Sequence, residues 1–399
     1  MLHTLRNWLR KTNDRAIVCT FMLFAAFLLA LPSPFANRID TTAEQIKGRV
    51  TTVDNTQLQH HSLITVGTQL LEVNILEGKE KGRQATVTNQ LLGRLDIDKS
   101  FKVGDDVLLV ITYQQDGQID TITPQDHYRI TLELGLFCLF AILLIAFGGW
   151  TGCKALLSFI ITGLVLWKIF IPALLLGYNP IAIALCVVGI LTAVIIFLVA
   201  GMNTMGVTAF LGAMLGIGAS CALALWAAAS FNLHGAVMPF AETLLYAGYA
   251  HLDITAIYVA AIFVAASGAV MDLAMDVAAS VKEVVHNTPD ISRTQALYSG
   301  IRVGRAVVGT MTTTLLLAYS GGYVTLMMAF MAQGIPVINI LNMLYVAAEL
   351  VKTLVGSFGL VLVAPFTACV GSILLTNPAR DTTITVQPAT IPTPSAPRS

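Results

Sequence analysis

The chain has 399 residues, of which 56% are hydrophobic and only 12% are charged, and its mean hydropathy is +0.75. A soluble domain carries about 25% charged residues, so this composition indicates a membrane protein. The formal net charge is zero. This balance argues against a nucleic-acid partner, because such proteins carry a basic surface, and it leaves the lipid bilayer as the expected partner.

A membrane-spanning helix needs about 20 mainly apolar residues. Besides the candidate spans, two stretches, 232–252 and 337–351, are apolar but interrupted by polar residues or proline. Each is compatible with a span, a re-entrant segment or an interfacial helix, and 337–351 also with an extension of the last span. We expect about eight transmembrane helices, with about seven of them forming a membrane domain over residues 130–376. The eight candidate spans are 16–34, 130–148, 153–174, 180–201, 206–230, 254–278, 306–330 and 352–376.

Basic residues predict the orientation, since Lys and Arg concentrate in short cytoplasmic loops. The segment before the first span holds Arg6, Arg10, Lys11 and Arg15, and the loop 282–305 holds four more basic residues. Eight spans place both segments on the same side. We therefore expect a plasma-membrane protein with a cytoplasmic N-terminus and with residues 37–129 outside the cytoplasm.

Residues 1–36 have a basic start and an apolar core, which is also the layout of a signal peptide. No A-x-A pattern precedes Ala36, so an uncleaved membrane anchor is favoured over a cleaved signal. At the other end of the chain, residues 377–399 are rich in Thr and Pro and are predicted to be a disordered tail.

Residues 37–129 change character and predict a small extracytoplasmic β-rich domain. The hairpin signal is Asp116-Gly117, between Val107–Gln115 and Gln118–Ile122. Five or six short strands at this spacing predict a closed or partly closed barrel of OB-like or SH3-like type. The predicted strands are Ile46–Val53, Leu63–Val66, Leu70–Leu76, Gln84–Thr88 and Val107–Thr112.

Motifs of the common catalytic classes do not occur. The sequence has no P-loop lysine motif, G-x-S-x-G, H-E-x-x-H or C-x-x-C. We therefore expect no enzyme activity, no catalytic residue and no cofactor. His60 and His61 are adjacent in a predicted strand and point to opposite faces, which argues against a shared metal ion. The six cysteines lie in or beside apolar runs, which predicts buried hydrophobic residues and not disulfides or metal ligands.

Asp272 and Asp276 follow about eighteen uncharged residues, at the end of a predicted span. Their spacing places both carboxylates on one helix face, one turn apart. A carboxylate in a span is costly and tends to mark a function, so the pair is the candidate proton or ion site. Two structural alternatives remain, namely a helix end at the cytoplasmic interface and a pair neutralised by Arg302 or Arg305.

The next span supplies a candidate polar path. Gly300 and Gly304 allow close helix approach, and Arg305 either snorkels to the interface or pairs with Asp276. Hydroxyl groups follow that donate either to a neighbouring helix or back to their own helix. They belong to Thr310, Thr312, Thr313 and Thr314.

Three further charged residues lie near the outside ends of predicted spans. Glu349 and Lys352 are three residues apart at the last span, and we expect them to neutralise each other on one helix face as a structural pair. Lys168 in the third span is expected to snorkel to the interface.

The chain resembles the YibE/F-like multipass membrane proteins over roughly residues 130–376, and residues 37–129 look like that family's N-terminal extension. This resemblance implies a membrane protein but carries over no substrate. The residues that carry it are Lys154–Ile171, Gly177-Tyr178-Asn179-Pro180, Gly206–Gly218 and, above all, Ser267–Gly322.

A weaker, superfamily-level resemblance links Gly268, Asp272, Asp276, Arg305 and the threonine run to the second half of SecD/SecF-type membrane units. It implies a role for an intramembrane Asp, Thr and Arg in proton flow. The chain departs from that pattern in having two extra spans and a much smaller outside domain.

Together these features predict a polytopic α-helical membrane protein acting as an ion- or proton-coupled permease or export accessory. The alternative is a non-transporting membrane scaffold that docks a membrane or extracytoplasmic protein partner through its β domain.

Overall fold

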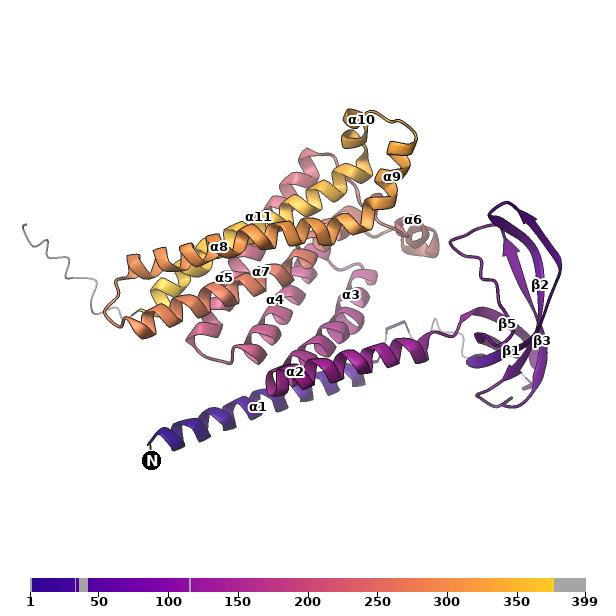
Figure 1. The fold of residues 1–399 in the computed structure, drawn as a ribbon, viewed down its shortest axis with the longest axis horizontal. Helices are drawn as coiled ribbons and strands as arrows, with labels where there is room; N and C mark the ends of the chain where they lie inside the picture. Colours follow the sequence, from indigo (N-terminus) through magenta and orange to yellow (C-terminus); the bar gives the residue numbers. More distant parts are fainter. Residues whose placement is uncertain (1, 33, 36–41, 115, 377–399) are drawn as a thin grey trace, which may run out of the picture. The chain divides into compact units, whose positions relative to one another are not determined.

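The structure is a computed structural model that describes residues 2–32, 34–35, 42–114 and 116–376, with the backbone alone for residues 2–14. The predicted tail, 377–399, lies outside the described residues. The chain divides into two compact units, one of residues 32–147 and one of residues 1–31 with 148–399 (Figure 1).

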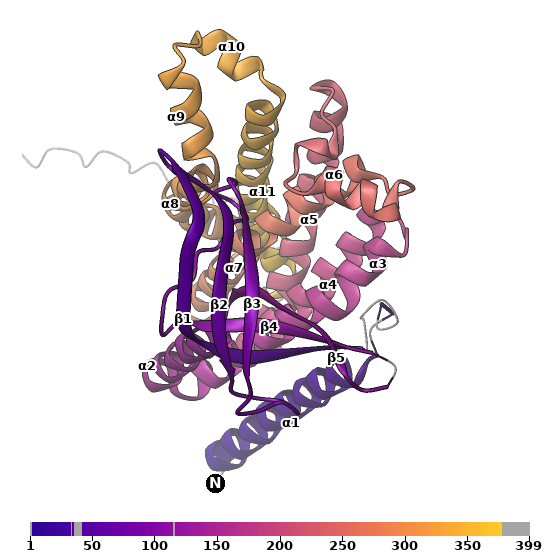
Figure 2. The same ribbon diagram turned by 90° about the vertical axis from the view of Figure 1, so that its right-hand side faces the viewer.

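The first unit contains a five-stranded antiparallel sheet in the order β3-β2-β1-β4-β5. Figure 2 shows β1, β2 and β3 side by side as long strands. The edge strands β3 and β5 also approach each other, so the sheet is nearly closed and barrel-like, as the sequence predicts. The strands are β1 (Ala43–His61), β2 (Ile64–Ile75), β3 (Gln84–Leu92), β4 (Asp106–Tyr113) and β5 (Ile119–His127).

One expected break in the sheet does not occur. The predicted strands Leu63–Val66 and Leu70–Leu76 form the single strand β2, which passes through Gly67 at a φ of 123°. A Cβ at Gly67 would lie 2.2 Å from the carbonyl oxygen of Gln57, beside an irregularity in the pairing of β1 between Asp54 and Gln57. A glycine opposite a bulge therefore bends the strand without ending it.

A buried amide network fixes the segment between β3 and β4. Gln69 is 1% exposed, and its Nε2 donates to Asn55 Oδ1 at 2.8 Å and to the carbonyl of Phe101 at 3.0 Å. Its Oε1 accepts from Asn89 Nδ2 and from the backbone N–H of Phe101. Every polar atom of Gln69 is thus satisfied, which is what allows this amide in an apolar core.

The second unit is helical, and residues 130–147 of the helical stretch Ile130–Leu175 belong to the first unit. Six helical stretches in the described part of the chain are long and apolar enough to cross a membrane, and Arg15–Ala30 is a shorter apolar helix. The helices are α1 (Leu2–Ala30), α2 (Ile130–Val165), α3 (Ile171–Leu175), α4 (Pro180–Val199), α5 (Thr204–Ser230), α6 (Ala241–Leu244), α7 (Ile254–Asn287), α8 (Arg293–Ser320), α9 (Val324–Ala332), α10 (Val337–Asn342) and α11 (Leu344–Leu374).

The expected number of about eight spans is not confirmed. The predicted spans 130–148 and 153–174 belong to one helical stretch, Ile130–Leu175, continued through a π-turn at Leu166–Phe170. The residues between the two predicted spans form a kink instead, since Gly149 alone departs from helical geometry, with φ 53° and ψ −127°. A glycine tolerates this conformation at little cost, so the chain bends there without a separate loop.

The predicted basic loop 282–305 is also largely helical. α7 continues to Asn287 and α8 begins at Arg293, so only residues 288–292 are non-helical. Val281 is buried and Val284 and Val285 are half-buried, which keeps one apolar face on this extension. The basic residues occupy amphipathic helix ends instead of a flexible loop.

Side-chain caps explain where several helices begin. The side-chain Oδ1 of Asn179 accepts from the N–H groups of Ile181 and Ala182, with Pro180 at the first helical position of α4. Asn203 and Asp253 cap α5 and α7 in the same way, and Ser292 forms a capping box with Gln295 at α8.

Small residues allow α5 and α11 to pack closely in opposite directions. A Cβ at Gly212 would lie 2.1 Å from Thr367 Oγ1, and one at Gly359 would lie 1.8 Å from Ser220 Oγ. Gly216 meets Val363 in the same register. These contacts recur every four residues along both helices, which is the small-residue packing typical of membrane bundles.

α7 lies beside α11 and runs parallel to it. The Tyr258 hydroxyl donates to the carbonyl of Ala348 at 2.7 Å. Cβ atoms at Gly356 and Gly371 would lie 3.3 Å from Ala266 Cβ and from Val281 Cγ1. The pairs 258/348, 266/356 and 281/371 share one sequence separation, so the register between these helices stays constant from one end to the other.

The two interrupted stretches, 232–252 and 337–351, adopt different secondary structures. The first forms a short 3-10 turn, α6 and a π-turn, none long enough to span. The second contains α10 as a separate short helix, whereas residues 344–351 extend α11. Lys168, expected to snorkel, instead donates to the carbonyl of Leu31 just after α1 at 2.9 Å.

All six cysteines are free. Only Cys221 is buried, and Cys19, Cys138, Cys186 and Cys369 are exposed on helices. The expectation of burial is therefore wrong for these four, because apolar residues of a membrane helix can face lipid as well as the bundle core.

Candidate functional site

The carboxylates of Asp272 and Asp276 lie on the one open face of α7. Both side chains are exposed, whereas their neighbours Met271, Leu273, Ala274 and Val277 are buried. The exposed positions recur at helical spacing and consist mainly of small residues and carboxylates. We call this face the α7 stripe; it comprises Ala261, Ala265, Gly268, Asp272, Asp276, Ala279 and Glu283.

The remaining sides of α7 are packed. Helices α4, α5, α8 and α11 all contact it, and its buried residues form the centre of the largest apolar cluster. Figure 1 shows α7 among these helices. The predicted placement of both carboxylates on one helix face is confirmed, and that face is turned away from the bundle core.

The predicted partners lie at the right depth but do not pair with the carboxylates in the described part of the chain. Cβ atoms at Gly300 and Gly304 would lie 2.7 Å from Val281 Cγ2 and 3.6 Å from Val277 Cγ2. α7 and α8 are therefore antiparallel, with Asp276 level with Arg305. The side chains of Arg302 and Arg305 are exposed, and the ion pairs of the described residues do not include them.

The threonine hydroxyls all turn back onto their own helix. Thr310 donates to Val307 O at 2.9 Å, Thr312 to Val308 O at 2.9 Å, and Thr313 and Thr314 to the carbonyls of Gly309 and Thr310. Thr310, Thr313 and Thr314 are exposed. In this conformation the run presents hydroxyl oxygens along α8 without a hydrogen bond to a neighbouring helix.

A second charged cluster joins α7, α8 and α11. Lys352 Nζ lies 3.3 Å from Glu349 Oε2, as expected from their spacing, and 5.3 Å from the centre of the Tyr319 ring. The Tyr319 hydroxyl is buried without a hydrogen-bond partner among the described residues. Tyr258 on α7 completes the cluster, because its hydroxyl donates to the carbonyl of Ala348, next to Glu349. Neither tyrosine is predicted from the spacing of the charged residues. The sequence feature that indicates this cluster is that Glu349 and Lys352 are the only charged residues between 306 and 379.

The register of α7 and α11 decides how deep these charges lie. In that register Glu349 is level with Val259, which is 17 positions from Asp276 on α7. At about 1.5 Å per residue the two are roughly 26 Å apart along the axis, which is less than the hydrocarbon thickness of about 30 Å. If these helices cross a bilayer, at least one of the two charged groups has its backbone inside the apolar layer.

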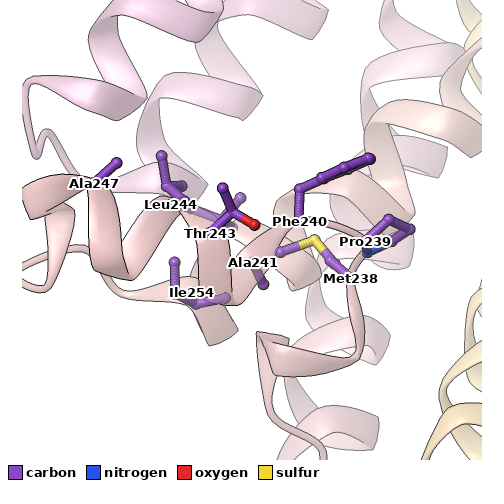
Figure 3. Close-up of a pocket in the computed structure, with 9 residues that line it drawn as sticks. Met238, Pro239, Phe240, Ala241, Thr243, Leu244, Ala247 and Ile254 are labelled. Carbon is purple, nitrogen blue, oxygen red and sulfur yellow. The ribbon is translucent and has the colours of Figure 1, made fainter. Parts of the chain in front are cut away.

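Two hollows open near the start of α7, and neither contains Asp272 or Asp276. One, of about 370 Å³, is apolar and is formed by α6 with its flanking residues. Figure 3 shows Met238 and Phe240 on one side of it and Leu244 and Ala247 on the other. The second, of about 500 Å³, lies between the ends of α4, α5 and α7 and has the helix cap Asp253 in its wall.

Polar groups of the β domain form ion pairs instead of an open site. Lys47 Nζ and Arg49 Nε lie 2.8 Å and 2.9 Å from the Asp106 carboxylate, and these contacts, first the one with Lys47, hold the pKa of Asp106 below its usual value. Burial and the bond to Glu44 raise the pKa of Tyr113 to about 12. Among the described residues no group of three or more His, Cys, Asp or Glu side chains could hold a metal ion.

Apolar helices of spanning length, packed through small residues and linked to a small β domain, define a multipass integral membrane protein. The chain belongs to the YibE/F-like protein family, whose sequence pattern matches residues 136–377, and the YibE/F family N-terminal domain matches residues 41–126. No curated protein and no solved structure matches the chain, and the resemblance to SecD/SecF-type units finds no support.

Proposed function

We propose that this protein is an ion- or proton-coupled permease or export accessory in which Asp272 and Asp276 bind the coupling ion. The observation that carries the proposal is the pair of carboxylates on the α7 stripe, without an ion pair among the described residues. Lipid tails cannot solvate a carboxylate, so such a pair is either protonated, bound to a cation or covered by a further group.

The charge distribution favours a cation over an anion as the coupling ion. From residue 169 to residue 281 the sequence contains no Lys or Arg, whereas Glu242, Asp253, Asp272 and Asp276 are acidic. Two carboxylates one helical turn apart repel each other when both are ionised, and a bound proton or cation relieves that repulsion. The exposed hydroxyls of Thr310, Thr313 and Thr314 extend the polar surface on α8.

The test is proton or monovalent-cation flux in proteoliposomes, with a pH-sensitive dye enclosed and a cation gradient imposed. We expect Asp272→Asn with Asp276→Asn to reduce the flux at least tenfold. Glu283→Gln is the matched control, because Glu283 lies on the same stripe two turns further along α7, and it should keep most of the flux. Flux through the double variant equal to that of the wild type would sink the proposal.

A scaffold role remains the second candidate, because the end of the β1–β2 hairpin and the adjoining end of β3 expose apolar side chains. Leu63 is 82% exposed and Leu92 is 66% exposed, and Val66 pairs with Leu92 in the sheet. Such a patch is typical of a docking surface. A photo-crosslinker at Leu63 should then capture one defined partner in cells, whereas one at exposed Lys81 should not.

A further inference from the structure

One end of the β domain carries a cluster of exposed aliphatic side chains. Leu63, in the turn between β1 and β2, is 82% exposed, and Leu95, in the loop after β3, is 74% exposed. Eight large apolar side chains are exposed among the described residues of the five strands and their loops, and six of them lie at this end. We call this end the β tip; it comprises Leu63, Ile64, Val66, Leu92, Leu95 and Ile97.

An ordered backbone displays these side chains as one surface. A Cβ at Gly93 would lie 2.7 Å from Ile64 Cγ2, so the loop after β3 begins against the β1–β2 hairpin. The Asp98 carboxylate accepts from the backbone N–H groups of Leu92 and Arg94 at 3.0 Å and 2.8 Å. These two hydrogen bonds fold the loop tightly onto the end of β3, so the β tip is a fixed feature of the domain.

The β tip carries little uncompensated charge. Residues 55–71, which include the whole turn of the β1–β2 hairpin, contain no Asp, Glu, Lys or Arg, although charged residues are frequent in the rest of the domain. In the loop after β3, Arg94 Nη2 lies 2.8 Å from Asp96 Oδ2, so these two charges compensate each other. Moving an ion out of water is costly, and a surface with this composition can leave water for an apolar environment.

The strand register places the β tip on the side of the domain from which α2 leaves. β1 and β5 are both antiparallel to β4, so they point the same way. Gly48 on β1 and His127 at the end of β5 both pair with Val107, which makes the two strands level there. β1 continues from Gly48 to His61, which is at most roughly 40 Å at about 3.3 Å per residue. The hairpin therefore extends past the end of β5.

The apolar layer of the membrane begins close to that side of the domain. Only Tyr128 and Arg129 separate β5 from α2. Within α2, residues 134–153 contain no charged residue and provide the apolar length that a membrane crossing needs. Even with an extended link, this apolar segment starts at most roughly 17 Å from the end of β5. The hairpin is long enough to reach the bilayer.

We propose that the β tip inserts its aliphatic side chains into the surface of the bilayer that α2 crosses. Leu63 and Leu95 enter the acyl region, whereas the backbone and the Arg94–Asp96 pair stay at the level of the headgroups, where polar groups remain hydrated. The occupant of this surface is thus lipid, and the β domain is held on the membrane at a second point besides its link to α2.

Fluorescence quenching tests the insertion. In the full-length chain with its native cysteines replaced, an environment-sensitive fluorophore is attached to Leu63→Cys or to Leu95→Cys in phosphatidylcholine nanodiscs. We expect doxyl-labelled phosphatidylcholine to quench both fluorophores, and aqueous iodide to quench them about threefold less than a fluorophore at Gln118→Cys. Gln118 is the matched control, because it is exposed in the turn between β4 and β5, at the opposite end of the domain.

A charge placed in the β tip provides a second measurement. Leu63→Glu combined with Leu95→Glu should abolish lipid quenching of a fluorophore at Leu92→Cys, since a carboxylate does not enter the apolar layer. Gln118→Glu should leave that quenching unchanged. Both leucines are exposed, so the substitutions remove no packed side chain, and unchanged amide-exchange protection of β4 verifies that the domain is folded.

Three results would overturn the proposal. The first is a β tip that iodide quenches as strongly as the control position and that labelled lipid does not quench, which would leave it in water. The second is shielding from iodide without lipid quenching, which would show that a protein covers the surface and would favour the scaffold role. The third is lipid quenching that survives both glutamates. Ion flux does not enter any of these readouts, so the insertion and the proposed function fail separately.

Discussion

Individual glycines set the distance between α5 and α11. Gly212 has no room for a side chain, since an added Cβ would lie 2.1 Å from Thr367 Oγ1 and 2.8 Å from the Thr367 Cα. Gly218, on the same helix, has nothing within 4 Å of such a Cβ. The two positions therefore allow the same substitution to be compared in a packed and an open site.

We expect Gly212→Ala to destabilise the bundle by about 1–3 kcal/mol, because overpacking forces two helices apart. Gly218→Ala should be neutral or stabilising, since alanine is the better helix former by about 1 kcal/mol. Thermal unfolding in detergent, followed by helical circular dichroism, checks both. Equal melting temperatures for the two variants would contradict the close packing.

Residue spacing alone predicted part of the site. It placed Asp272 and Asp276 on one face and joined Glu349 to Lys352, because these relations are local to one helix. It could not decide between the structural and the functional role of Arg305, because that depends on which way neighbouring helices are rotated. Asp276 and Arg305 do not pair within the described residues because the rotation of each helix about its axis turns the two side chains away from each other.

At the scale of elements, the ion pair between β1 and β4 links pH to the stability of the β domain. Arg49 lies directly opposite Asp106 in the strand register, and Lys47 adds a second contact at 2.8 Å. The folded-state pKa of Asp106 lies below its unfolded value of 3.8. The Asp106 carboxylate therefore contributes its full stabilisation of the β domain at pH values above the unfolded pKa. This stabilisation is lost as the pH falls through the lower, folded pKa.

Asp106→Asn should cost about 1 kcal/mol at neutral pH and less at a pH near 2, because that pH lies below the unfolded pKa of 3.8. Hydrogen–deuterium exchange of β4 amides in the full-length protein, corrected for the intrinsic exchange rate at each pH, measures this difference. A deficit of equal size at both pH values would show that the carboxylate charge is not what joins the two strands.

Element ends were harder to predict than element types. The strand break expected at Gly67 is absent because a bulge in β1 accommodates the glycine, and this depends on pairing that sequence periodicity does not report. Likewise α7 extends past the expected residue 278 to Asn287, because residues beyond an apolar run can stay helical when one face remains packed.

At the scale of the whole molecule, the helix directions together show which connections lie at the same end of the helical bundle. α5 is antiparallel to α11, α11 is parallel to α7, and α8 is antiparallel to α7. Between the parallel helices α7 and α11, α8 therefore runs in the opposite direction. The connection from Gly321 to Met343, which includes α9 and α10, must begin and end at the same end of the bundle.

A labelling experiment checks this arrangement. In a chain with its native cysteines replaced, new cysteines at Gln333 and at Tyr246 should react with a membrane-impermeant maleimide from the same side of sealed vesicles. Both positions are exposed, Tyr246 at 89%. A cysteine at Pro289, in the turn between α7 and α8, should react only from the opposite side, and any other combination contradicts the helix directions.

The parallel course of α7 and α11 also restricts the number of membrane crossings between them. Two helices that point the same way are separated by an odd number of crossings, so the apolar hairpin of α9 and α10 contributes an even number, here zero. The side from which one tag in that hairpin is accessible then gives the side of three other connections. Residues 231–253 lie on the same side as the hairpin, and residues 200–203 and 288–292 lie on the opposite side. A single label on the hairpin thus determines the absolute orientation of this membrane unit, whatever number of spans precedes it.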